Sequence, residues 1–124
     1  MAAAMTAGVQ SVPGRGTTVK HFACNNLEND RVELNSIVSE RALRELYLKG
    51  FEIALRSPTP PAAVMTAYNL VNGVHAANSY ALCTVLAREE WGYRGVLMTD
   101  WDSTGSRRCT AVGQNTPAHT ARLP

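Results

Sequence analysis

Residues 95–101 read Gly-Val-Leu-Met-Thr-Asp-Trp, a short apolar run that leads directly into a carboxylate and an indole. Two earlier stretches follow the same plan: residues 17–20 run into a Lys-His pair, and residues 64–67 run into a Tyr-Asn pair. Short apolar or β-branched runs bounded by turn signals are typical of buried strands. We therefore predict three strands, each with polar side chains at its carboxyl end.

The segment between the first two runs predicts a helix. Ser39 is a suitable N-cap, and Glu40 follows it in the positively charged first turn. The proline-rich residues 57–61 end this helix, because proline lacks the amide hydrogen and restricts the residue before it. Apolar or small residues recur at intervals of three and four, and we expect them to pack on the sheet: Leu43, Leu46, Tyr47, Gly50 and Ala54.

A second helix is predicted from residue 79 or 80 to Glu90, after a turn at Asn72-Gly73. Residues 91–95 then turn the chain into residues 96–98, which we expect to form a strand buried on both faces. The expected buried side of the second helix consists of Leu82, Val85, Leu86 and Cys83.

The resulting order is strand, helix, strand, helix, strand, which favours parallel pairing through right-handed crossovers. In a β/α barrel the carboxyl ends of successive parallel strands meet at one face, so the polar residues after the three runs are expected to share a pocket. A closed barrel of eight strands needs about 250 residues, whereas this chain has 124. The predicted fold is therefore α/β, a partial (β/α)8 TIM-type barrel of about three parallel strands with two crossover helices.

The composition argues against several other classes of protein. Lys and Arg exceed Asp and Glu by 12 − 10 = 2, and the charges are spread along the chain, so no nucleic-acid partner is indicated. The apolar runs are too short to span a bilayer, and residues 1–5 lack the basic and apolar regions of a secretion signal. The sequence therefore indicates no membrane partner and leaves the localisation unknown.

Metal and cofactor sites are not expected either. The three cysteines are far apart and are interpreted as free thiols. His21 and Cys24 have the spacing of metal ligands, but no second pair lies nearby to complete a zinc site. The Gly-x-Gly at residues 14–16 lacks the remaining glycine of a dinucleotide fingerprint. His75 and His119 are interpreted as surface residues.

Four stretches resemble the N-terminal barrel domain of glycoside hydrolase family 3: residues 19–26, 39–45, 65–69 and 98–101. They occur in the family's order, and the Asn-Asn-x-Glu at residues 25–28 is similar to its β-glucosidase branch. The resemblance implies an incomplete barrel domain over residues 1–105. An irregular or disordered tail is expected over residues 106–124.

The resemblance also implies roles for five residues. Asp100 corresponds to the catalytic nucleophile, which forms a glycosyl-enzyme intermediate. Lys20 and His21 correspond to a pair that hydrogen-bonds sugar hydroxyls. Tyr68 corresponds to a tyrosine beside the nucleophile, and Trp101 to an aromatic wall of the leaving-group subsite. The family implies no cofactor.

The residue types suit these roles. A retaining glycosidase needs one ionised carboxylate to attack and a second carboxyl about 5–5.5 Å away as acid and base. A cation such as Lys20 nearby, or a hydrogen bond from the Tyr68 phenol, would favour the ionised form of Asp100. The indole of Trp101 offers apolar area to the C–H face of a sugar.

Each of the five residues also has a structural alternative. An isolated aspartate after a strand, such as Asp100, is often a helix N-cap. His21 alone is more often a structural histidine, and Lys20 alone a solvated surface charge. Tyr68 and Trp101 have the alternative of core aromatics with a satisfied polar tip.

The expected activity is retaining hydrolysis of terminal β-D-glucosyl residues from β-glucosides, with a small carbohydrate as substrate. It is expected of a complete parent enzyme, because the family takes its acid/base glutamate from a following sandwich domain and further sugar contacts from upstream barrel strands. The isolated chain is therefore expected to be inactive. The alternatives are an inactive truncation product, a small α/β module that binds a carbohydrate or a protein, and β-xylosidase activity.

Overall fold

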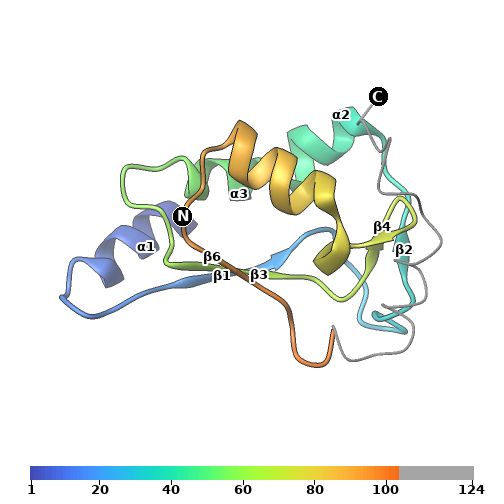
Figure 1. The fold of residues 1–124 in the computed structure, drawn as a ribbon, viewed down its shortest axis with the longest axis horizontal. Coiled ribbons are helices and arrows are strands. Elements are labelled where there is room, and N and C mark those ends of the chain that lie inside the picture. Colours follow the sequence, from blue (N-terminus) through green and yellow to red (C-terminus); the bar gives the residue numbers. More distant parts are fainter. Residues whose placement is uncertain (104–124) are drawn as a thin grey trace.

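The computed structural model describes residues 1–103 and shows a mixed α/β arrangement (Figure 1). Its main sheet contains β1 (Thr18–Phe22), β3 (Ala63–Thr66) and β6 (Val96–Met98) in the order β1-β3-β6, and both pairings are parallel. The three predicted strands and their parallel pairing are therefore confirmed. The predicted tail at residues 106–124 and its boundary lie outside the described residues.

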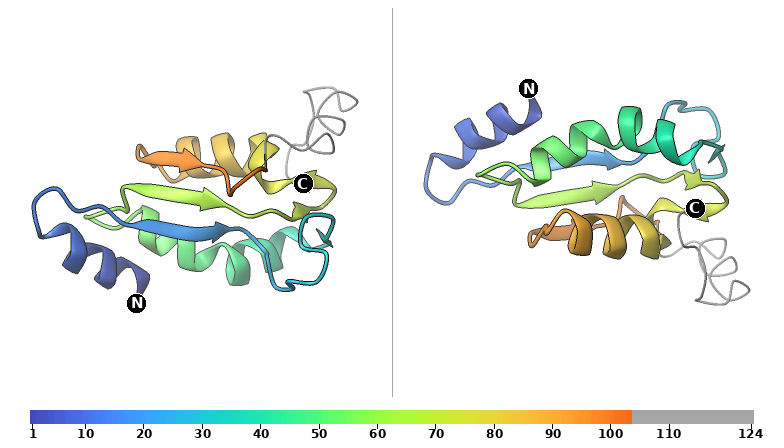
Figure 2. Two further views of the ribbon diagram at one scale, coloured as in Figure 1. Left: turned by 90° about the horizontal axis from the view of Figure 1, so that it is seen from below. Right: turned by 90° about the horizontal axis from the view of Figure 1, so that it is seen from above.

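Helical segments connect the three strands. Between β1 and β3 the chain forms α2 (Glu40–Ala42), the π-helical η1 (Leu43–Tyr47) and α3 (Lys49–Leu55), and between β3 and β6 it forms the π-helical η3 (Ala81–Glu90). These segments lie on one face of the sheet (Figure 1, Figure 2). Parallel strands joined by helices on one face are the repeating unit of a β/α barrel. The described residues thus form part of such a barrel, as predicted.

The first crossover helix begins at the predicted N-cap Ser39, whose hydroxyl accepts a backbone hydrogen bond, but it buries a different face from the one expected. Its π-helical turn closes where the Leu48 amide donates to the Leu43 carbonyl at 2.8 Å. In a π-turn five residues separate stacked positions, so Leu48 is buried whereas Leu46 is 73% exposed. The predicted stripe is correct at two positions, Leu43 and Ala54, and wrong at three exposed ones, Leu46, Tyr47 and Gly50.

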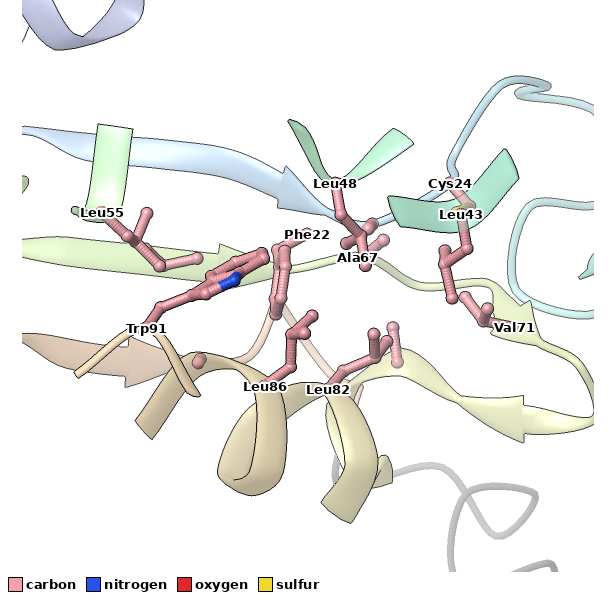
Figure 3. Close-up of a cluster of buried hydrophobic side chains, with 14 of the residues drawn as sticks. Phe22, Cys24, Leu43, Leu48, Leu55, Ala67, Val71, Leu82, Leu86 and Trp91 are labelled. Carbon is pink, nitrogen blue, oxygen red and sulfur yellow. The ribbon is translucent and has the colours of Figure 1, made fainter. Parts of the chain in front are cut away.

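The hydrophobic core lies between the helices and the sheet (Figure 3). The centroid of the Phe22 ring is 5.0 Å from that of Phe51 and 6.1 Å from that of Trp91. Tilted aromatic pairs at such distances stabilise a core beyond the area they bury. On η3 the predicted buried residues divide into two buried and two half-buried side chains: Leu82 and Leu86, and Val85 and Cys83.

An N-terminal helix, α1 (Ala2–Gln10), has no counterpart among the predicted elements. Its residues are mostly alanine and other small or apolar residues without a polar face, so no periodic stripe marks it in the sequence, and its single buried side chain is that of Thr6. Polar contacts of Gln10 hold it against the starts of two strands. The Gln10 Oε1 atom accepts hydrogen bonds from the amides of Thr17 and Ala62 at 3.2 and 3.0 Å, and Nε2 donates to the Pro60 carbonyl at 2.9 Å.

A second, small sheet lies beyond the carboxyl ends of β1 and β3 (Figure 1). It contains β2 (Asn35–Ser36), which pairs in parallel with β4 (Leu70–Val71), and β5 (Val74–His75), which pairs antiparallel with β4. Asn72 and Gly73 have φ angles of +50° and +89°, as a two-residue type I′ hairpin requires. The predicted turn is therefore confirmed. The 3₁₀ turn η2 (Ala76–Asn78) leads on to η3.

Two predictions about burial are wrong. His75 is predicted at the surface, but it is 5% exposed and its Nδ1 atom lies 3.1 Å from the Tyr68 carbonyl oxygen. The strand at residues 96–98 is predicted to be buried on both faces, but Val96 is 60% and Met98 39% exposed. The reason is that β6 is an edge strand among the described residues and only one face of the sheet carries helices.

Candidate active site at the carboxyl ends of the strands

Asp100 follows β6 and is 6% exposed. Its Oδ1 atom accepts a hydrogen bond from the Trp101 amide at 2.8 Å, and its Oδ2 atom lies 3.2 Å from Nε2 of His21. Burying an ionised carboxylate costs free energy unless it is paired or hydrogen-bonded. Contacts of this kind are present at both oxygens of Asp100.

His21 reaches Asp100 from inside β1. The sequence predicts Lys20 and His21 at the carboxyl end of the strand, but β1 extends to Phe22 and both residues lie within it. The pairing of β1 with β3 shifts between Val19 and Phe22, and the Lys20–His21 peptide bond is cis. The His21 side chain is 31% exposed. A protonated His21 would make a charge-assisted hydrogen bond to the carboxylate of Asp100.

Tyr68 is the second side chain close to the carboxylate. It follows β3, is half-buried, and lies near enough to Asp100 for the negative charge of the carboxylate to act on its phenol. Burial and the negative charge of Asp100 raise the pKa of Tyr68 above its ordinary value of 10.0, although the positive charge of Arg31 opposes this shift. The raised pKa keeps the phenol protonated and able to donate. Tyr68 and His21 therefore meet at one carboxylate, as predicted from their places in the sequence.

The side chains of Lys20 and Trp101 are exposed to solvent, unlike those of His21 and Tyr68, which are half-buried. The Lys20 side chain is exposed and forms no hydrogen bond or ion pair with any residue from 1 to 103, so the basic side chain in contact with Asp100 is His21 and not Lys20. The Trp101 side chain is not a core aromatic, since the residue is 79% exposed. Asn69, the other polar residue after β3, is fully buried and donates to the Ala23 carbonyl at 3.1 Å. It joins the ends of β1 and β3.

No pattern in the sequence marks Arg31 as a neighbour of this site. It lies in the polar stretch between β1 and β2, where charged residues are typical of a solvated loop. In the structure its guanidinium carbon lies 4.6 Å from the centroid of the Tyr68 ring. The only signal available in the sequence is an acid, Glu28, three residues before it.

Within residues 1–103 no group of three or more His, Cys, Asp or Glu side chains is placed to hold a metal ion, and no helix is long and apolar enough to cross a bilayer. The strand ends bring together a buried carboxylate, an imidazole in contact with it and a phenol nearby. The carboxyl ends of parallel strands are where β/α-barrel enzymes carry their active sites.

Comparison with known proteins identifies the family. Residues 1–118 match the glycosyl hydrolase family 3 N terminal domain, and the chain therefore belongs to this family. A β-glucosidase of Ruminococcus albus is 48% identical over 115 residues, which cover 93% of this chain and 12% of that protein. An exo-α-(1→6)-L-arabinopyranosidase of Bifidobacterium breve is 45% identical over 100 residues, which cover 81% of this chain and 13% of that protein.

The crystal structure of a β-glucosidase from Kluyveromyces marxianus in complex with glucose has the same arrangement of elements. It matches with a TM-score of 0.77 and 47% identity, covering 82% of this chain and 12% of that one. The chain thus spans about an eighth of the relatives it resembles. Membership of the family and the partial barrel fold both follow from these matches.

Proposed function

We propose that this chain supplies the nucleophile of a retaining β-glucosidase active site and that Asp100 is this nucleophile. The observation that carries the proposal is the meeting of His21 and Tyr68, from two neighbouring strands, at a carboxylate that is 6% exposed. A carboxylate held in place by an imidazole and a phenol is oriented for attack on one carbon atom. The family to which the chain belongs supports glycoside hydrolysis as the reaction.

The proposed reaction has two steps. An Asp100 oxygen attacks the anomeric carbon, and the bond from that carbon to the leaving oxygen breaks as a carboxylic acid from a part of the enzyme outside residues 1–103 protonates this oxygen. Water then loses a proton to the same group, attacks the anomeric carbon and releases Asp100 as a carboxylate. Tyr68 and His21 keep the carboxylate oriented in both steps.

Lys20 and Trp101 are proposed to contact the substrate rather than the nucleophile. The Lys20 ammonium is exposed next to His21 in β1 and has hydrogen-bond donors free for sugar hydroxyls. The exposed indole of Trp101 directly follows the nucleophile and offers apolar area to the sugar or its leaving group. Hydrogen bonds to sugar hydroxyls that strengthen in the transition state increase the rate. We place all these residues in a barrel portion that ends near residue 105.

The proposed substrate is a terminal β-glucoside. It is supported by the similarity to the β-glucosidases of Ruminococcus albus and Kluyveromyces marxianus, the second of which was solved with glucose. The similarity to an arabinopyranosidase favours a pentopyranoside as the second candidate, with a β-xyloside among the possibilities.

The proposal is tested in a chimera in which residues 1–103 of this chain replace the matching segment of the Ruminococcus albus enzyme. The chimera is expected to hydrolyse a nitrophenyl β-glucoside faster than the corresponding β-xyloside. Asp100→Asn is expected to lower kcat by at least about three orders of magnitude, because an amide cannot form the covalent intermediate. A 2-fluoro-glucoside with a dinitrophenyl leaving group should label Asp100, and peptide mass spectrometry locates the label.

Asp102→Asn is the matched control, because Asp102 is an exposed carboxylate two residues further along. It should leave most of the activity, and both variants should melt near the temperature of the unmodified chimera. A label on another residue, or near-normal turnover with Asp100→Asn, would remove Asp100 from the nucleophile role. The isolated chain is expected to show no turnover. Its saturable binding of glucose without turnover would favour the binding-module alternative.

A further inference from the structure

Arg31 takes no part in the proposed reaction, yet it packs on a residue that does. Its guanidinium carbon lies 4.6 Å from the centroid of the Tyr68 ring, within the range of about 6 Å over which a cation is attracted by an aromatic face. Arginine is suited to this contact because its planar group stacks on a ring while its N–H groups still donate. The contact therefore restricts where the Tyr68 ring can lie.

A second interaction fixes the guanidinium itself. Arg31 Nη1 donates to Glu28 Oε2 at 2.8 Å, and the other oxygen of Glu28 accepts from Asn25 Nδ2 at 3.1 Å. The side chains of Arg31 and Glu28 are 44% and 67% exposed, so the ion pair alone contributes little to stability. The ion pair instead orients the Arg31 guanidinium, because the same group donates to Glu28 while it packs over the Tyr68 ring.

The backbone on both sides of this contact is held independently. The Leu34 carbonyl accepts from the Leu70 amide at 2.8 Å, which joins the end of the Arg31 loop to the segment after Tyr68. The buried His75 ring contacts the Tyr68 carbonyl oxygen at 3.1 Å. These bonds fix the Tyr68 backbone but not the rotation of its side chain. The orientation of the ring depends on its own surroundings, and among the described residues the charged groups that act on the phenol are Arg31, Asp100 and Asp102.

We propose that Arg31 is a positioning residue that holds the Tyr68 ring in the orientation from which its hydroxyl reaches Asp100. Glu28 contributes to this positioning, since its carboxylate orients the Arg31 guanidinium. The catalytic consequence rests on the proposed function of Asp100, whereas the positioning of Tyr68 does not. The two are therefore tested separately.

The positioning role is measured as the pKa of Tyr68 in the 124-residue chain, by NMR of tyrosine labelled at the ring carbon that bears the hydroxyl. Tyr68→Phe identifies the signal among the four tyrosines. If Arg31 only supplies positive charge, Arg31→Met raises the pKa of Tyr68, because that charge opposes the upward shift. If Arg31 positions the ring, Arg31→Met lowers the pKa toward its ordinary value of 10.0, because the hydroxyl leaves Asp100 and becomes solvated.

A double-variant cycle makes the distinction sharper. Asp100→Asn should lower the pKa of Tyr68 in the unmodified chain and change it little once Arg31 is replaced, since the two groups are then no longer in contact. Arg41→Met is the matched control, because Arg41 forms a comparable exposed ion pair with Glu45 at 3.1 Å and has no aromatic partner among the described residues. This control should leave the pKa of Tyr68 unchanged.

The catalytic consequence is measured in the chimera. Arg31→Met and Tyr68→Phe should each lower kcat/KM by about tenfold, the order expected from loss of one such contact, and the double variant should lose little more than either. A pKa of Tyr68 that rises or stays unchanged in Arg31→Met, with the full effect of Asp100→Asn retained, overturns the proposal. An inactive unmodified chimera would instead count against the proposed function, and the tyrosine titration would still decide the role of Arg31.

Discussion

Replacing Leu48 with alanine tests the π-helical register of the first crossover. A regular helix that starts at Ser39 puts Leu46 on the stripe with Leu43, whereas the π-turn puts Leu48 there. Leu48 is 1% exposed and points into the core near Phe22 (Figure 3), whereas Leu46 is 73% exposed. The same substitution at positions two residues apart should therefore have very different effects on the free energy of unfolding.

The magnitudes follow from burial. Each buried carbon contributes about 0.8 kcal/mol, so removing the outer carbons of Leu48 costs about 2.4 kcal/mol in transfer free energy. The cavity left behind brings the total to about 3 kcal/mol, inside the range of about 2–5 kcal/mol for buried leucines. Leu46→Ala removes mostly solvent-exposed area, and alanine is a slightly better helix former. Its effect should stay within about 0.5 kcal/mol.

Urea unfolding of the 124-residue chain measures both values. Trp91 is a suitable fluorescent reporter, because it is 7% exposed and packs near Phe22 in the core. Trp101 is 79% exposed and is replaced by Phe in all samples to remove its signal. A loss in Leu46→Ala equal to or larger than the loss in Leu48→Ala would refute the π-helical register.

Two further predictions concern the polar contacts outside the core. Gln10→Ala should lower the free energy of unfolding by about 1–2 kcal/mol in the same urea experiment, because the amides of Thr17 and Ala62 lose their acceptor. Glu52→Gln should destabilise the chain at neutral pH and lose this effect in acid. The Lys49 ammonium holds the pKa of Glu52 below its ordinary value of 4.5, so the stability from Glu52 is present above that pH and is lost as the pH falls through the lowered folded pKa.

A neighbouring residue provides the control for Gln10→Ala. Ser11→Ala removes a hydroxyl that bonds only within its own helical turn, to the Gly8 carbonyl at 2.7 Å, and should cost less than Gln10→Ala. A Gln10→Ala effect no larger than this would show that α1 is not held by its strand contacts. For Glu52 the test is the unfolding free energy of both proteins from pH 7 to pH 3. A difference that stays constant with pH would contradict the linkage.

Much of the fold was predictable because it depends on local chemistry. Strands at residues 17–20, 64–67 and 96–98 were recognisable from apolar runs between turn signals, and the structure places β1, β3 and β6 there within about two residues of each end. The Asn72-Gly73 turn follows from the backbone angles that only a few residues adopt at low cost. The short β2 and the alanine-rich helix α1 carry no such pattern and were not predicted.

The candidate site was predictable to the extent that it depends on topology. Parallel strands bring their carboxyl ends together, so His21, Tyr68 and Asp100 were expected to meet, and these three do. The approach of Arg31 to Tyr68 was not predictable, because it depends on the path of a polar loop that carries no periodicity. Distance along the sequence also gives no indication that His75 is buried against the Tyr68 carbonyl.

The sequence by itself determined the order of the strands and helices, the turns and the residue types at the strand ends, because these depend on preferences of a few neighbouring residues. Only the tertiary structure decided which helix face is buried and which strand lies at the edge. A single π-turn buries Leu48 and leaves Leu46 and Tyr47 exposed, and the position of β6 at the edge of the described sheet leaves Val96 exposed. Both outcomes depend on packing between segments far apart in the chain, where the free energy of burial outweighs local preference.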